Sequence, residues 1–405
     1  MARVSAPPEL LEDAELGLAE GAARPEAAAV RLRRRGVELS WGEPVPLDRR
    51  ALLRAARERG RSSVAMLRAD PSLVTEMQVG SWFNAGWRAR ALRRVVLRTR
   101  TERLLAPLGG LARRTAIDAA FWAGVRDAAD ADEWRRLARS SYTALCYHRL
   151  AGDMKAGQEA MDMPPRLFRR QLRVLRLLGF RPLSAEELQR FHSDARSWLP
   201  RRRYLLTADD GFSDNLTPLR GAEAAQLFVP TREVGRGAWW MGGEPIASWE
   251  ELAQLERDGV AIGSHSGSHV ALTDLPEAEL RGDLAASRRE LAEHLSSPLA
   301  LLAYPHGRHD ERVRSAAIGA GFGGAYTTLN GRNGAGTDAF CLRRVEPKAH
   351  DGVAGFLWKV LTGELLPRRW ERRVNPAAAG RRSSPAAGPR DDDPQAPAPP
   401  PTPVP

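Results

Sequence analysis

Cysteine and long apolar runs are both scarce in this chain of 405 residues. Its two cysteines, Cys146 and Cys341, are too few for a disulfide-stapled scaffold or a cysteine-based metal site. No run of about 18 apolar residues occurs, and the N-terminus lacks a positively charged stretch followed by an apolar one. The sequence therefore predicts neither a membrane-spanning helix nor a secretory signal. We expect a cytoplasmic protein that could contact a membrane peripherally.

Positive charge is in modest excess. The chain carries 61 Lys and Arg against 50 Asp and Glu, which gives a formal charge of +11. These basic residues are widely spread and come without zinc-finger spacing or the aromatic signature of RNA-binding modules. We interpret the charge as affinity for anionic surfaces or as codon bias, and we expect no nucleic-acid partner.

Composition divides the chain into three parts. Residues 1–140 are rich in Arg and Ala and mostly helical in propensity, which predicts a helical region in front of the main domain. Residues 141–366 alternate short apolar runs with amphipathic stretches, a pattern typical of a parallel α/β architecture. Residues 367–405 form a low-complexity tail rich in Pro, Ala and Arg, and we expect it to be disordered because it can bury little apolar surface.

Apolar runs in the middle part predict strands. They are Thr143–His148, Tyr204–Ala208, Leu227–Thr231, Val260–His265, Leu299–Pro305 and Phe322–Thr328. Helices between them have recognisable starts, since Ser184 and Ser248 each precede a Glu by three residues, the spacing of a capping box. Polar clusters stand at or just after the C-terminal ends of several predicted strands. In a β/α barrel these ends converge on one rim, where active sites lie.

The strongest chemical signal is a pair of carboxylates at the end of a predicted strand. Asp209 and Asp210 follow the apolar run Tyr204–Ala208 and precede Gly211. Adjacent side chains at a strand end point in different directions, so one carboxylate can bind a metal while the other faces the substrate water. Alone, an Asp-Gly sequence is more often simple turn chemistry.

Two histidines follow the next strong strand. His265 and His269 bracket a Gly/Ser loop, and imidazoles four residues apart on a helical turn or a tight loop can meet at one metal. A His pair can arise by chance in any protein. Only eight His occur in the chain, however, and two of them lie together at a strand end.

Weaker signals stand at the ends of two more strands. The loop Tyr304-Pro305-His306-Gly307 could present a backbone N–H toward a developing oxyanion, although Pro and Gly end strands in many proteins. His148 ends the first predicted strand. A lone His is usually structural, but this one is expected at the same rim as the Asp pair.

Together these residues resemble the motifs of polysaccharide deacetylases, the NodB-homology family of carbohydrate esterases. Thr207–Gly211 is similar to their Thr-Phe-Asp-Asp-Gly motif, His265–His269 matches their His-Ser/Thr-x-x-His motif, and Tyr304–Gly307 resembles their third motif. The sequence Tyr-His-Arg around His148 resembles the branch in which the general-acid His comes early. The resemblance covers about Ser141–Glu346 and implies an irregular (β/α) barrel of the NodB-homology type.

The resemblance implies a metal-dependent hydrolase that removes N-acetyl groups from amino sugars of a polysaccharide or glycan precursor. Asp209 is then the catalytic base, and Asp210, His265 and His269 hold a divalent metal, for which two imidazoles and one carboxylate favour zinc. His148 would protonate the leaving amine. The backbone of the third-motif loop would help to hold the oxyanion.

The sequence departs from the family pattern in several places. Ala208 replaces the motif Phe, and Ala303 stands where many members carry an Arg that orients the base. No Asp-x-x-x-Trp motif follows the Asp pair and no late Leu-x-His motif is present, so His306 is the rival of His148 for the role of acid. Two other functions stay open: a metal-dependent amidase for another N-acyl substrate, and a non-catalytic carbohydrate-binding descendant.

A second resemblance lies in the N-terminal part. Leu11–Gly17, followed by Arg33–Gly36, resembles the acceptor-side end of a family-two glycosyltransferase, in which a Glu-Asp pair precedes Leu-Gly and a helix ending in Arg-Gly. The nucleotide-sugar half, with its Asp-x-Asp metal motif, is absent upstream. We therefore expect a remnant without transferase activity.

Overall fold

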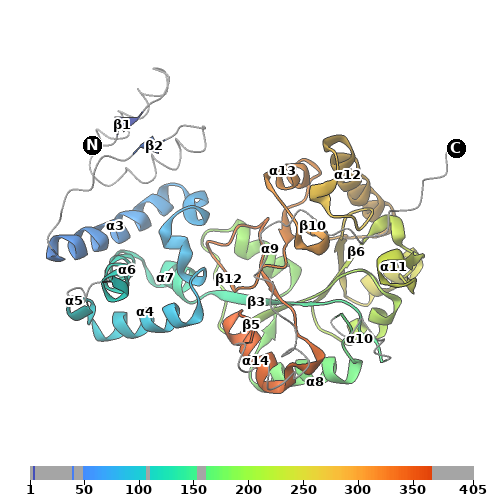
Figure 1. Ribbon diagram of the computed structural model, residues 1–405, viewed down its shortest axis with the longest axis horizontal. Helices are drawn as coiled ribbons and strands as arrows, with labels where there is room; N and C mark the ends of the chain where they lie inside the picture. The colour runs from blue at the N-terminus through green and yellow to red at the C-terminus, as the bar shows by residue number, and fades with distance from the viewer. Residues whose placement is uncertain (1–2, 5–38, 41–48, 106–109, 153–160, 367–405) are drawn as a thin grey trace. The chain divides into compact units, whose positions relative to one another are not determined.

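The computed structural model describes residues 3–4, 39–40, 49–105, 110–152 and 161–366 (Figure 1). Contacts divide the chain into residues 1–365 and residues 366–405. Both segments that resemble a glycosyltransferase, and the Pro-rich tail, lie outside the described residues. The predictions made for them stay predictions.

A helical region precedes the barrel (Figure 1). Its helices are α3 (Arg49–Ala69), α4 (Trp87–Thr99), α5 (Glu102–Leu105), α6 (Gly110–Ala128) and α7 (Ala131–Ala138), with two 3-10 segments, Pro71–Thr75 and Gln78–Phe83, between α3 and α4. The strand β1 (Arg3–Val4) pairs with β2 (Leu39–Ser40). Helical structure is thereby confirmed for the described part of residues 49–140. Among the described residues, no helix combines the length and the apolar character needed to span a bilayer.

The next part of the chain builds a mostly parallel sheet. Its main strands, in sheet order, are β3 (Ser141–Tyr147), β5 (Arg203–Ala208), β6 (Ala225–Val229), β9 (Ala261–Ser264), β10 (Leu301–Ala303) and β11 (Gly324–Tyr326). Neighbours in this series are all parallel. Each predicted strand is thus confirmed. Almost all residues of these six strands are buried, as their apolar composition requires.

Short strands extend the sheet and nearly close it. They are β4 (Arg181–Pro182) beside β5, and β12 (Asn333–Gly334) and β13 (Arg344–Val345) beside β3. Tyr326 at the end of β11 forms a parallel bridge with Leu342, and two residues later Arg344 pairs with Ala144 of β3. One stretch of chain therefore links the last strand back to the first. The predicted irregular (β/α) barrel is confirmed.

Helices surround the sheet (Figure 1). They are α8 (Pro165–Leu177), α9 (Ala185–Ser193), α10 (Leu216–Arg220), α11 (Trp249–Arg257), α12 (Glu277–His294), α13 (Glu311–Gly319) and α14 (Gly352–Thr362), and a small hairpin of β7 (Gly237–Ala238) and β8 (Glu244–Pro245) follows β6. Ser184 and Ser248 both form the predicted capping boxes, with Glu187 and Glu251. These caps satisfy free N–H groups at the starts of α9 and α11.

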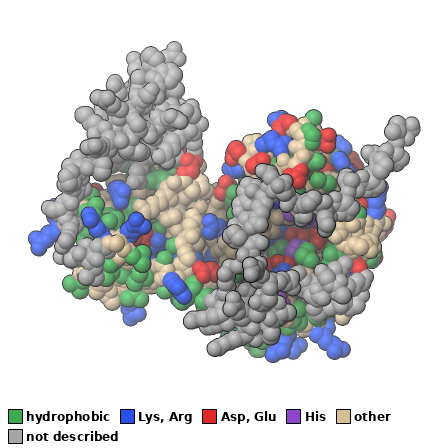
Figure 2. All heavy atoms as spheres, in the orientation of Figure 1, with side chains coloured by type: hydrophobic (Ala, Val, Ile, Leu, Met, Phe, Trp, Pro, Cys, Tyr) green, Lys and Arg blue, Asp and Glu red, His purple; other side chains and the backbone are tan. Residues whose placement is uncertain are grey.

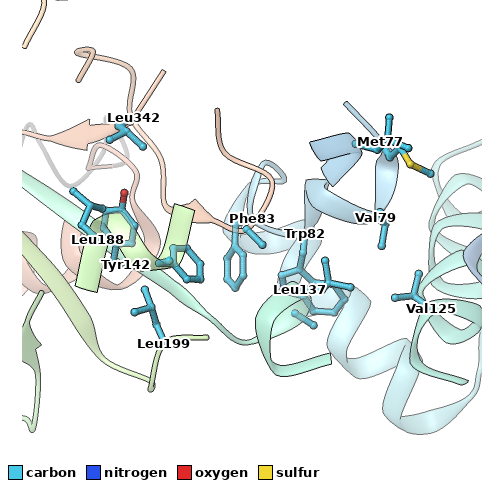
Figure 3. Close-up of a cluster of buried hydrophobic side chains, with 14 of the residues drawn as sticks. Met77, Val79, Trp82, Phe83, Val125, Leu137, Tyr142, Leu188, Leu199 and Leu342 are labelled. Atoms are coloured by element: carbon cyan, nitrogen blue, oxygen red, sulfur yellow. The ribbon is translucent and has the colours of Figure 1, made fainter. Parts of the chain in front are cut away.

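One hydrophobic cluster joins the helical region to the barrel (Figure 3). In it Phe83 lies between Trp82, which packs among the helices, and Tyr142 of β3. The connection also has polar contacts, since the Arg90 guanidinium donates to the carbonyl oxygen of Thr362 at 2.9 Å. The helical region and the barrel are therefore stabilised together.

Candidate active site

The polar groups identified in the sequence lie at one end of the barrel. Since the main strands are parallel, residues that follow their C-terminal ends meet at one rim. His148 follows β3, Asp209 and Asp210 follow β5, His265 follows β9, and Tyr304–Gly307 follows β10. Figure 2 shows histidine and acidic side chains close together near the middle of the barrel.

Three buried side chains at this rim converge, and we call them the metal-type triad: Asp210, His265 and His269. The Nε2 atoms of His269 and His265 lie 2.9 Å and 3.4 Å from Oδ1 of Asp210. One possible ligand atom from each residue lies within 4.8 Å of the other two. Among the described residues, Asp210 Oδ1 nevertheless has no hydrogen-bond partner. Two imidazole nitrogens and a carboxylate oxygen that converge on one buried point fit a shared cation.

Protonation states in the triad suit ligation. Burial would raise the pKa of Asp210, but the two imidazoles lower it well below its usual value. Burial lowers the pKa of His269 to about 4. Nδ1 of His265 lies 2.7 Å from the carbonyl oxygen of Ala303, which can only accept a hydrogen bond. His265 therefore carries its proton on Nδ1 and keeps the Nε2 lone pair free.

The backbone around the triad is strained. Asp210, Ser266, His269 and His306 have φ angles of 69°, 67°, 58° and 56°, in the left-handed region that residues with a Cβ disfavour. They are four of the seven non-glycine residues with positive φ in the described chain. Such strain persists where the surrounding structure holds it, and it clusters at functional sites.

Asp209 points to a different partner. One guanidinium nitrogen of Arg344 lies 2.7 Å from Oδ1 of Asp209, and both side chains are buried. Burial would raise the pKa of Asp209, but Arg344, assisted by His265, lowers it below its usual value. The Asp209 carboxylate is therefore ionised near neutral pH and can accept a proton.

Cys146, His148 and Asp209 form a second cluster, with one donor atom from each within 4.8 Å of the others. A cation is disfavoured there because the positive charge of Arg344 already lies against Asp209. Burial also raises the pKa of the Cys146 thiol, which keeps it protonated. The cluster instead brings the imidazole of His148 near the Asp209 carboxylate, so both can reach one small reacting group.

His148 is held by a carboxylate and by an amide. Its Nδ1 lies 3.2 Å from Oε1 of Glu346, and the Asn215 amide donates to its carbonyl oxygen at 2.7 Å. Burial alone would lower the pKa of His148, but Glu346, together with Asp210 and Asp209, raises it above the usual value. The imidazole is therefore protonated over a wider pH range than a free histidine.

Arg344 and Glu346 were not identified from the sequence. They belong to β13 and the residue after it, and a strand of two residues is too short to show an apolar run. Glu346 does follow a strand end, which is the signal that singled out the other site residues. Arg344 reaches Asp209 from a different strand than the one that ends at Ala303, so an arginine contacts this carboxylate although position 303 carries none.

The third-motif loop lies beside the triad, but its side chains differ in exposure. Tyr304 is buried, stacks on His309, and donates its hydroxyl to the Phe340 carbonyl at 3.2 Å, so it supports the loop from below. Pro305 is buried as well. His306 is exposed, and its ring centroid lies 5.1 Å from that of His269. Gly307, with φ of 70°, leaves room for the Thr328 side chain.

Comparison with known proteins gives this site a class. The family model described as "Polysaccharide deacetylase" matches residues 199–325, which contain the Asp pair, the His pair and the third-motif loop. The chain therefore contains a polysaccharide deacetylase domain, and proteins with this domain form a class of enzymes.

Individual relatives are distant. YxkH of Bacillus subtilis (strain 168), whose name places it provisionally among polysaccharide deacetylases, is 21% identical over 217 residues, 52% of this chain and 72% of its own. The deacetylase PplD of Streptococcus pyogenes, solved with acetate, is 22% identical with a TM-score of 0.48, covering 54% of this chain and 98% of PplD. IcaB from Ammonifex degensii is 25% identical with a TM-score of 0.48, covering 54% and 97%.

Proposed function

We propose that this protein is a metal-dependent N-deacetylase that hydrolyses the acetamide of an amino sugar in a polysaccharide or glycan precursor. The observation that carries the proposal is the metal-type triad beside an ionised Asp209, with His148 within 4.8 Å of that carboxylate. The family model over residues 199–325 supports this choice of substrate class.

The triad would hold the metal. Two imidazoles and one carboxylate leave a position open for water or substrate, and this donor set favours zinc. A divalent ion bound there polarises an amide carbonyl and lowers the pKa of water. Ala303 and Trp240 would orient the two histidines, because the carbonyl of Ala303 contacts His265 and the Trp240 ring stacks on His269 at 3.7 Å.

Side chains of the protein would move the protons. Asp209 accepts the proton of the attacking water, since Arg344 keeps this carboxylate ionised. His148 donates a proton to the amine nitrogen as it leaves, and Glu346 keeps the imidazole protonated until then. The backbone N–H of His306 would donate to the developing oxyanion from the loop beside the triad.

His148 carries the first test of these roles. His148→Ala is expected to lower kcat by about 100-fold with the metal retained, because general-acid assistance contributes roughly that much. A general acid works only when protonated, so activity should fall as pH rises through the pKa of His148. Glu346→Gln removes the carboxylate that raises this pKa. The alkaline limb of the kcat/KM profile should then move to lower pH.

His306→Ala is the matched variant for the acid. It also removes an imidazole at the rim, but an exposed one without the Glu346 contact that raises the pKa of His148. If His306→Ala loses turnover while His148→Ala keeps it, the acid has been assigned to the wrong residue.

Trp239 offers a surface for the sugar. Its side chain is 36% exposed and its ring centroid lies 6.4 Å from that of His269. Exposed aromatic faces can stack on apolar faces of ligands, and stacked pairs of aromatic side chains contribute about 0.5–1.5 kcal/mol. Trp239→Ala should therefore raise KM for N-acetylated chitooligosaccharides by about 3- to 10-fold and leave kcat nearly unchanged.

Trp198→Ala serves as its control. Trp198 is 41% exposed and contacts Arg135 of the helical region. It should leave both kinetic constants unchanged, and an equal rise in KM for both variants would remove Trp239 from the substrate site.

Release of acetate from N-acetylated chitooligosaccharides by the zinc-loaded full-length protein tests the function directly. Hydrolysis of other N-acyl amides without acetate release from the sugars would favour the amidase alternative. Binding of the sugars without any hydrolysis would favour the carbohydrate-binding descendant.

A further inference from the structure

A second concave site lies between the helical region and the barrel. It is a cavity of about 890 Å³, and its lining contains nine arginines and one acidic residue, Asp127. We call it the arginine cavity. A cavity of this size is typical of small-molecule sites and too small to enclose a nucleic-acid duplex.

Its one carboxylate is already engaged elsewhere. Asp127 accepts from Arg57 at 2.6 Å and from Arg61 at 3.4 Å, and neither of these arginines lines the cavity. The guanidinium groups of Arg94, Arg139 and Arg201 line it and form no hydrogen bond or ion pair with any described residue. The arginine cavity therefore holds more positive charge than the described protein around it neutralises.

The guanidinium groups of Arg90 and Arg332, which also line the cavity, form hydrogen bonds within the protein, unlike those of Arg94, Arg139 and Arg201. Arg90 donates to the Ala85 and Thr362 carbonyls, and Arg332 donates to the Val360 carbonyl and the Thr143 hydroxyl. These contacts are with neutral groups, so they leave the positive charge in place. Burial, with Arg90 and Arg94 close by, lowers the pKa of Arg332 to about 9.

The sequence of α4 repeats this charge along one face. Arg90, Arg94 and Arg98 are spaced by four residues, so their side chains lie in one row, about 6 Å from one to the next. Like charges at this spacing destabilise a helix because their side chains repel one another. Arg201, from the turn before β5, adds to the crowding, because it is one of the charges that lower the pKa of Arg94. The row costs stability unless an anion lies against it.

The cavity is distinct from the candidate active site. Ser141 starts β3 and Arg201 precedes β5, so the cavity lies at the N-terminal ends of strands whose C-terminal ends carry His148 and Asp209. A six-residue strand such as β5 separates the two by about 20 Å.

We infer that the arginine cavity binds a diphosphate group carried by a nucleoside or by a lipid. Planar guanidinium groups bind phosphate oxygens in pairs, and a row of them fits two linked phosphates better than a single anion. Trp134 and the exposed side chain of Leu361 also line the cavity, and they provide an apolar wall for the group that carries the diphosphate.

Calorimetric titration of the full-length protein with inorganic pyrophosphate in about 0.15 M NaCl tests this inference. The variant Arg94→Gln/Arg201→Gln should bind pyrophosphate at least about 10-fold more weakly, since a hydrogen bond to a charged group contributes about 1.5–3 kcal/mol. The matched variant Arg88→Gln/Arg170→Gln removes the same charge from exposed arginines of α4 and α8 outside the cavity. It should bind like the wild type.

Further probes identify the carrier. The variant Arg94→Gln/Arg201→Gln should bind both uridine diphosphate and phosphatidylcholine vesicles that contain a polyprenyl diphosphate more weakly than the wild type. The probe that the wild type binds more tightly identifies the carrier as a nucleoside or a lipid. Three results would overturn the inference. They are no pyrophosphate binding by the wild type, an equal loss in both double variants, and binding of duplex DNA in place of pyrophosphate.

Discussion

Asp210→Ala is expected to empty the metal site and to remove deacetylase activity. The Asp210 carboxylate lies between the two imidazoles and supplies the negative charge of the metal-type triad. Loss of a residue that only hydrogen-bonds to a metal ligand lowers metal affinity by about 10- to 100-fold. Loss of a ligand itself should therefore lower the affinity by more than about 100-fold. Elemental analysis after dialysis should find about one divalent ion per wild-type chain and almost none in the variant.

His265→Ala should behave in the same way, because it removes another donor from the same point. Asp258→Ala is the control, since among the described residues the Asp258 side chain forms only a surface ion pair with Arg220 at 2.6 Å and a hydrogen bond with Gln254. Thermal unfolding would show that each variant is folded. Equal metal content in wild type, Asp210→Ala and His265→Ala would exclude this site as the metal centre.

Asp209→Asn should give the opposite combination: the metal stays and turnover falls by about 100- to 10,000-fold. Asn keeps the shape of the side chain but cannot accept the water proton, and general-base assistance is worth about that factor. Because Arg344 binds Asp209 and not the triad, the change should leave the ligand geometry intact. Steady-state kinetics and elemental analysis on one preparation would measure both effects.

Cys146→Ala is the matched control for the base. The Cys146 thiol donates to Asp209 at 3.5 Å, so this variant touches the same carboxylate without removing its charge. We expect turnover within a few-fold of wild type. If Asp209→Asn loses metal and activity together, Asp209 is itself a ligand and the two carboxylates have been given the wrong roles.

The rim of the barrel was predictable from the sequence because its signals are local. An apolar run that ends in a polar pair marks a strand end, and parallel strands bring their ends together whatever fills the loops. His148, Asp209 and His265 therefore met as expected. The contact between Asp210 and His269 follows from a tight turn, with Ser266 and His269 both at positive φ.

Arg344 and Glu346 depend on how the barrel closes. Their strand, β13, has two residues and pairs with β3, which lies about 200 positions earlier in the chain. A pairing of so few residues leaves no periodic pattern. Only the packed sheet shows that Arg344 reaches Asp209 and that Glu346 reaches His148.

The sequence by itself determined which polar residues follow the ends of strands. It therefore indicated the Asp pair, the His pair and the barrel. Tertiary structure decided which charges those residues face. It buried Tyr304 below its loop, supplied Arg344 in place of an arginine at 303, and gathered arginines from α4 and the turn before β5 into one cavity. The physical reason is that local pattern governs strand ends and helix faces, whereas pairing of charges depends on distances set only when remote segments pack.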